Sequence, residues 1–118
     1  MRMLDLWLRE VKEKSDPDSL GMILVHDGIV RGTSKTGQCI KGMHLSHDKE
    51  KLDLVASRLR MREGIVDIRV WINSGKLKVG DDIMLVLVAG RFRTDILPVF
   101  TELLTAIKGE IVREREIS

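Results

Sequence analysis

The feature that most constrains the fold is the uninterrupted apolar run IMLVLVA at residues 83–89. A strand with one face in water alternates apolar and polar residues, whereas a strand covered on both faces does not. The run therefore predicts a central strand with packed elements on each side. Since 43% of the 118 residues are hydrophobic, the chain can form one compact core but not two. We therefore expect a single domain over residues 1–118.

Three amphipathic segments are predicted to form helices that supply this cover. The first runs from Leu4 to the turn-forming sequence SDPDS, and Asp48 can cap the second. The third begins near Thr94, with Pro98 in its first turn, where a helix needs no backbone N–H donor. Gly109 is expected to end this helix in a left-handed cap.

Extended segments separate these helices. They cover residues 20–30, 39–45, 65–72, a short stretch at 77–79 and the charge-alternating tail at 110–118. The alternation within residues 65–72 predicts a half-buried strand with Asp67 and Arg69 on its polar face. The order of helices and strands predicts an α+β fold, in which three helices pack against a mainly antiparallel or mixed sheet.

The composition argues against several classes of protein. The chain has 20 basic and 18 acidic residues, and its aromatic residues are two Trp and two Phe. Neither the net charge of +2 nor this supply of stacking side chains is typical of a nucleic-acid-binding protein. The N-terminal segment is too charged for a signal peptide, and no apolar run reaches membrane length. The single cysteine, Cys39, cannot form an intrachain disulfide, so we expect a cytoplasmic protein without a membrane partner.

The stretch DGIVRGTSKTGQCIKG, residues 27–42, combines glycines with hydroxyl and cationic side chains directly after an apolar strand. Such a loop can bind a phosphate, because glycine lets backbone N–H groups approach an anion closely. It can also be a solvated connection between two strands, which its composition favours. The sequence SKT does not end a P-loop, because the required glycines are not at the right offsets before Lys35.

The remaining polar residues form no catalytic or metal-binding pattern. His44 and His47 have a spacing found in zinc sites, but no cysteine or carboxylate stands at a suitable distance. Asp81 and Asp82 follow a glycine in a turn, where acidic side chains commonly cap backbone groups. No Ser-His-Asp or Cys-His arrangement is found. We therefore expect neither a metal nor a cofactor.

Cations stand at the ends of several predicted elements. They are Arg31, Arg93, Lys108, Arg113 and Arg115. Lys108 can complement the dipole at the C-terminus of its helix, and the two C-terminal arginines alternate with glutamates as in a solvated edge strand. Each cation thus has a structural explanation, so a functional argument depends on their order along the chain.

Three features follow one another in an order known from one protein family. They are the segment GIVR, the segment SGKLKVGDD and the cations of the last helix. That family has a G-x-V-R segment, matched by Gly28, Val30 and Arg31. It also has a V-G-x-L-x-V-G-[DE] segment, whose match ends at Asp81, and an arginine and a lysine that open and end its last long helix. The chain therefore resembles the large, catalytic subunit of molybdopterin synthase, the MoaE family, over nearly all of its length.

The chain departs from this family at positions that matter for chemistry. Phe92 stands where the family has the histidine of a His-Arg pair, and Arg115 stands where it has a second lysine. The Pro and Trp that precede that lysine in the family are absent here, and so is an N-terminal strand. Residues 72–75 replace a V-H-R-V-G segment. About half of the family's site is thus kept.

The resemblance implies an α/β-hammerhead fold and a sulfurtransferase activity in molybdenum cofactor biosynthesis. In the family, a small ubiquitin-like subunit presents a C-terminal Gly-Gly thiocarboxylate. This group sulfurates cyclic pyranopterin monophosphate to give the dithiolene of molybdopterin. The large subunits form a homodimer within a heterotetramer. The run at residues 83–89 also favours a homodimer, because its apolar surface exceeds what one thin layer of helices covers.

The resemblance also implies a site. Its substrate-binding residues are Ile29, Val30, Arg31, Phe92, Arg93, Lys108 and Arg115, and its catalytic residues are Lys108 and Arg115. Arg31 and Arg93 can each offer paired N–H donors to a monophosphate. Lys108 can transfer protons if burial near Arg93 disfavours its charge. Arg115 stays protonated, so it can hold an anion but cannot take a proton.

Two other functions remain open. The losses at Phe92 and Arg115 also fit a non-catalytic MoaE-like module that binds the small subunit or a pterin phosphate. If the resemblance is set aside, the chain is a homodimeric structural or interaction protein whose cations are solvated. Reconstitution with a thiocarboxylated small subunit and the pterin precursor distinguishes these functions, because only the synthase forms molybdopterin.

Overall fold

The computed structural model of the chain describes residues 2–118. Its elements follow in the order α1 (Arg2–Lys14), β1 (Met22–Ile29), β2 (Gly42–His47), α2 (Lys49–Arg60), β3 (Ile65–Ile72), β4 (Gly75–Lys78), β5 (Asp82–Gly90), α3 (Arg93–Ala106), the π-helix η1 (Ile107–Ile111) and β6 (Val112–Ile117). This set of elements confirms the predicted α+β class. Within the described range, no helix is both long enough and apolar enough to span a membrane.

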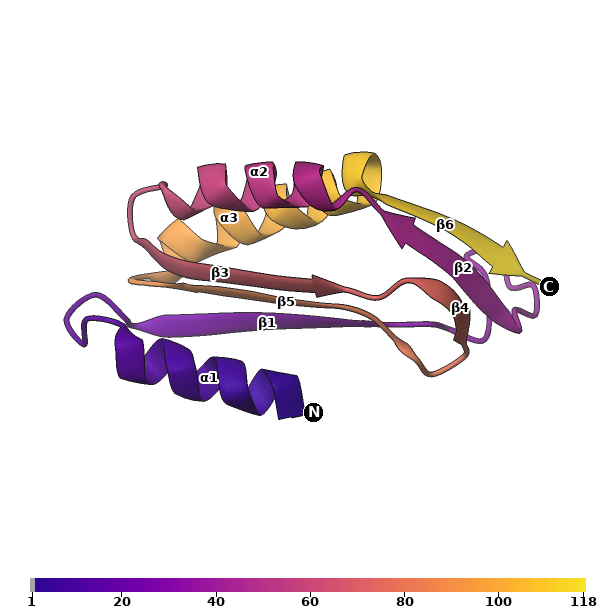
Figure 1. Cartoon of the computed structure of the whole chain (residues 1–118), viewed down its shortest axis with the longest axis horizontal. Coiled ribbons are helices and arrows are strands. Elements are labelled where there is room, and N and C mark those ends of the chain that lie inside the picture. The colour runs from indigo at the N-terminus through magenta and orange to yellow at the C-terminus, as the bar shows by residue number, and fades with distance from the viewer. Residues whose placement is uncertain (1) are drawn as a thin grey trace.

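The strands of the described range form two three-stranded sheets rather than one. The strand order is β1-β5-β3 in the first sheet and β4-β2-β6 in the second, and every pairing is antiparallel. Figure 1 shows α2 and α3 on one face of the first sheet and α1 on the other, while the second sheet extends beyond one end of the helices. The molecule is therefore elongated, with principal extents of 49, 27 and 25 Å.

Strand β5 is the centre of the first sheet and is covered on both faces, as its apolar sequence predicts. The residues from Leu85 to Ala89 are each 0% exposed. Val88 packs into the core beneath α2 and α3, whereas Leu87 packs with Val11 of α1. Each fully buried aliphatic side chain of this kind stabilises a fold by about 1.5–3 kcal/mol. Because the chain itself supplies both layers, the apolar surface of β5 does not require a dimer, and the homodimer stays a prediction.

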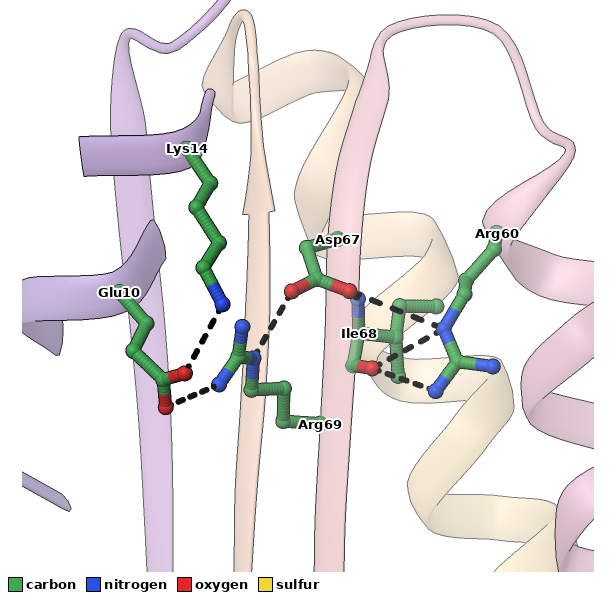
Figure 2. A network of polar contacts seen from close by, with 6 residues as sticks. All are labelled: Glu10, Lys14, Arg60, Asp67, Ile68 and Arg69. Atoms are coloured by element: carbon green, nitrogen blue, oxygen red, sulfur yellow. Dashed lines mark hydrogen bonds and ion pairs between the residues drawn. The ribbon is translucent and has the colours of Figure 1, made fainter. Parts of the chain in front are cut away.

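An ionic network fastens α1 to the first sheet (Figure 2). Glu10 of α1 accepts a hydrogen bond from Arg69 of β3 at 3.0 Å, and Arg69 donates another to Asp67 at 2.9 Å. At the free edge of β3, Arg60 of α2 donates to the backbone carbonyl of Ile68 at 2.7 and 3.0 Å. The polar face that alternation predicts for β3 therefore serves as the docking surface of α1.

The predicted helix boundaries are partly right. The carboxylate of Asp48 caps α2 by accepting a hydrogen bond from the backbone N–H of Lys51 at 3.1 Å, as expected. Helix α3 begins at Arg93, so Pro98 lies in its second turn and not in its first. A proline at that position cannot donate to the carbonyl of Thr94, and packing of the apolar face has to offset this loss.

The chain after α3 continues as η1 instead of ending in a left-handed cap at Gly109, so that prediction was wrong. In η1, Ile107 and Ile111 both reach the core, where they are 0% and 2% exposed. The helical path continues past Gly109 because this path buries Ile111 in the core. Lys108 lies between these two anchors on the exposed side of the turn.

Candidate active site

A cavity of about 400 Å³ lies between the two sheets, at the end of β1 and beside η1. The side chains and backbone that line it come from β1, the start of β5, η1 and β6. Its polar and predicted residues are His26, Asp27, Ile29, Arg31, Lys108 and Glu114. We call it the β1–η1 cavity. A volume of this size suits a small molecule, for which pockets of roughly 300–1,000 Å³ are usual.

Backbone hydrogen bonds of the preceding residue, Val30, fix the position of Arg31 beside this cavity. The backbone of Val30 donates to the carbonyl of Asp81 and accepts from the N–H of Gly80, each at 2.9 Å. The side chain of Val30 is 1% exposed, so it belongs to the core and cannot contact a ligand. Arg31 donates through Nε to the carbonyl of Thr33 at 3.1 Å. Its two terminal nitrogens remain able to bind an anion as a pair.

Lys108 enters the same cavity from the opposite side, through η1. Because Ile107 and Ile111 anchor the turn on both sides of it, the backbone position of Lys108 is fixed while its side chain stays exposed. Within one chain, Lys108 is not buried near Arg93. The two residues lie at opposite ends of α3 and both are exposed.

Phe92 and Arg93 stand about 22 Å from Lys108 along the helix, since an α-helix rises about 1.5 Å per residue. Phe92 is 59% exposed, and the guanidinium of Arg91 covers its ring at 5.1 Å from the centroid. Arg91 also donates through Nε to Asp95 at 3.0 Å. A ligand in the β1–η1 cavity therefore cannot contact Phe92 or Arg93 of the same chain.

Arg115 lies on the other face of the second sheet. Strand β6 alternates, so Val112 lines the β1–η1 cavity, whereas Arg113 and Arg115 line another hollow of about 250 Å³, and Glu114 borders both. In that hollow Arg115 stands directly opposite His44 of β2. The structure thus separates Arg115 from Lys108, although the sequence hypothesis assigned both to one site.

Of the predicted residues, the fold brings Ile29, Arg31 and Lys108 to one cavity. It also brings three residues that the sequence interpretation missed, namely His26, Asp27 and Glu114. The alternation of β1 offered a signal, because His26 and Gly28 lie on the same face of the strand. That signal could not be used without knowing that η1 and β6 close over this face.

Two of the missed residues are held towards their neutral forms. Burial, and secondly the positive charge of Lys108, lower the pKa of His26 below its ordinary value of 6.5. Partial burial, and secondly a hydrogen bond with Asp82, raise the pKa of Asp27 above its ordinary value of 3.8. The cavity therefore combines two cations, which can bind an anion, with a neutral imidazole that can accept a proton.

No group of three or more His, Cys, Asp or Glu side chains within residues 2–118 could hold a metal ion. His44 and His47, whose spacing resembles that of zinc ligands, are three residues apart on β2. Successive side chains of a strand point to opposite faces, so these two imidazoles diverge. The residues of the β1–η1 cavity thus point to anion binding and proton transfer rather than to a metal centre.

Several solved structures share the fold of this chain. Molybdopterin synthase from Staphylococcus aureus aligns with a TM-score of 0.75 and 19% identity, over 92% of this chain and 82% of that one. A MoaE protein of molybdopterin biosynthesis from Burkholderia ambifaria aligns with a TM-score of 0.75 and 20% identity, over 97% and 81%. The complex of subunits 1 and 2 of molybdopterin-converting factor from Helicobacter pylori aligns with a TM-score of 0.76 and 18% identity, over 98% and 75%.

The sequence comparison agrees with these structural neighbours. No curated protein matches the chain. The sequence pattern of the family described as MoaE protein, however, matches residues 3–110, which is most of the chain. The chain therefore belongs to the MoaE protein family.

Proposed function

We propose that the chain is the large subunit of a molybdopterin synthase and that the β1–η1 cavity is its active site. Membership of the MoaE family supports a role in molybdenum cofactor biosynthesis. The observation that carries the proposal is the meeting of Arg31 and Lys108, from distant parts of the sequence, in one cavity of small-molecule size. The proposed substrate is cyclic pyranopterin monophosphate, and the proposed reaction is its sulfuration in the cytoplasm.

Each residue of the cavity has a place in this reaction. Arg31 binds the phosphate through its two terminal nitrogens, since a guanidinium matches two phosphate oxygens at once. Ile29, which is 46% exposed, offers an apolar wall for the pterin. Lys108 donates a proton as sulfur replaces oxygen on the substrate.

The sulfur donor is proposed to be a small ubiquitin-like protein with a C-terminal Gly-Gly thiocarboxylate. The Helicobacter pylori neighbour is a complex of two subunits of molybdopterin-converting factor, which supports a small partner for this fold. A Gly-Gly tail has no side chains, so it can enter a cavity of about 400 Å³ alongside a substrate.

The proposed site includes Phe92, Arg93 and Arg115 only if a second copy of the chain is present. Within one chain, α3 separates Phe92 and Arg93 from Lys108 by about 22 Å. We propose a homodimer in which the Arg93 end of one copy reaches the β1–η1 cavity of the other, within a heterotetramer with two small subunits. Arg115 then holds an anion at the edge of the site, since it cannot take a proton.

Reconstitution tests the proposed function. The chain, a thiocarboxylated small subunit and cyclic pyranopterin monophosphate are mixed, and molybdopterin is measured. Wild type is expected to form product, while Lys108→Ala forms none yet still binds the small subunit. Lys49→Ala, an exposed lysine at the start of α2, is the matched control and should keep wild-type activity. Absence of product with wild-type protein contradicts the synthase proposal.

One observation favours the alternative of a non-catalytic module that binds the small subunit or a pterin phosphate. Phe92 and Arg115, where the chain departs from its family, both lie outside the β1–η1 cavity. The alternative predicts that wild type binds the small subunit or the precursor without forming product. Titration calorimetry on the same samples separates it from a protein that binds neither.

A further inference from the structure

We infer that His26 is the second proton-transfer group of the β1–η1 cavity, acting beside Lys108. This inference rests on the proposed function and adds a residue to it. The sequence hypothesis left Lys108 as the only group able to exchange protons, because arginine at position 115 cannot. The structure places an imidazole in the same cavity as Lys108.

The position of His26 is fixed by its neighbours. The ring of Phe100 from α3 meets the imidazole edge-on, with centroids 6.2 Å apart and an interplanar angle of 70°. A Cβ placed on Gly28 would lie 3.4 Å from Nε2 of His26. Because Gly28 has no side chain, the space beside that nitrogen stays open to the cavity. Phe100 thus orients the ring, and Gly28 leaves its nitrogen accessible.

The charges around His26 suit a proton acceptor. The charged side chains that line its cavity are Asp27, Arg31, Lys108 and Glu114. Burial and the nearby Lys108 keep the pKa of His26 below 6.5, so its imidazole is mostly neutral at neutral pH. A neutral imidazole has one nitrogen free to accept a proton, whereas an ammonium or guanidinium group has none.

The proposed step is the release of the sulfur carrier. Once the thiocarboxylate sulfur has bonded to a substrate carbon, it links that carbon to the acyl carbon of the carrier. Water attacks the acyl carbon while His26 takes one of its protons, and the new C–O bond replaces the C–S bond. The imidazolium then returns the proton to the departing sulfur. The products are the carrier's carboxyl group and a substrate thiol, with no net oxidation.

Single-turnover reconstitution of the full complex tests this role. His26→Phe preserves the packing on Phe100 and removes the ring nitrogens, and His26→Gln keeps polarity without a titrating group. Both are expected to slow product formation about 100-fold, the lower range for general acid–base catalysis. Both should also remove the loss of rate below about pH 6.5 that protonation of His26 causes in wild type. His47→Gln, which lies outside the cavity, is the control.

A second readout detects the trapped intermediate. If His26 serves carrier release, mass spectrometry of quenched His26→Phe reactions should show the small subunit still joined to the substrate. A His26→Phe protein with the wild-type rate, pH profile and carrier release overturns the inference but leaves the synthase proposal intact. A slow variant that keeps the wild-type pH profile and accumulates no adduct also overturns it. Wild type that forms no product overturns the synthase proposal and this inference together.

Discussion

The two ends of the segment formed by α3 and η1 each carry a cation, Arg93 at one end and Lys108 at the other, in very different surroundings. At one end, Lys108 faces a cavity together with Arg31 and an imidazole. At the other end, Phe92 is exposed and is covered only by Arg91, which is itself bound to Asp95. A single chain therefore has one enclosed end, where a cavity can hold a ligand, and one open end. The open end can contribute only to a site on a second molecule.

The largest effect is expected at the enclosed end. Lys108→Ala should lower molybdopterin formation by about 10²–10⁴-fold, the contribution of a positioned proton-transfer group, so that little or no product is detected. Binding of the small subunit should persist, since Ile107 and Ile111 keep η1 in place. Lys108→Ala with near-wild-type turnover in the reconstituted reaction would show that the enclosed end is not the catalytic one.

The next effect concerns the anion. Arg31→Ala should weaken binding of the pterin monophosphate by about 1.5–3 kcal/mol, the range for a hydrogen bond to a charged group. Folding should change little, because the one hydrogen bond of Arg31 links it to the neighbouring Thr33. Calorimetric titration of wild type and Arg31→Ala measures the difference. Equal affinities would favour a solvated loop at residues 31–41.

A smaller effect is expected on the ionisation of His26. Its pKa, followed by NMR of the imidazole Cε1 proton, should lie below 6.5 and rise in Lys108→Gln, because a nearby positive charge is removed. Since the folded protein disfavours the imidazolium, wild type should lose stability as pH falls from about 6.5 towards the lowered pKa. The free energy of unfolding of His26→Phe should lack this loss. An unchanged pKa in Lys108→Gln would contradict the proximity of the two groups.

The smallest effect is expected at the open end. The hydrogen bond from Arg91 lowers the pKa of Asp95 below 3.8. The stabilisation is therefore present above about pH 3.8 and is lost as pH falls through the lowered pKa. Asp95→Asn should reduce stability slightly at neutral pH, and its difference from wild type should vanish in acid, as followed by urea denaturation. A large loss of stability would show that this end is more rigid than its exposure implies.

Much of the fold follows from local patterns in the sequence. The range 65–72 predicted for a strand equals the bounds of β3, because Asp67 and Arg69 alternate with apolar residues and Gly64, with a φ of 80°, ends the preceding turn. The burial of β5 follows from its uninterrupted apolar run. The path of η1 could not be predicted, since it depends on the burial of Ile111 against distant elements and not on the nearby Gly109.

The site was predictable only in part, because its members come together through tertiary structure. Arg31 and Lys108 stand at element ends and could be singled out from the sequence. The face on which Arg115 lies depends on the register of β6 with β2, which alternating charges do not reveal. His26 lies within an apolar strand, and its relevance arises only when η1 and β6 pack over that strand.

Mixed dimers test most directly whether Arg93 of one copy and Lys108 of the other copy form one site. Arg93→Ala and Lys108→Ala should each be nearly inactive alone. A dimer that contains one copy of each has one cavity with Lys108 from one chain and Arg93 from the other, so mixing the two variants should restore product formation. If light scattering finds dimers but the mixture is no more active than its parents, or if the protein is monomeric, a site shared between copies is contradicted.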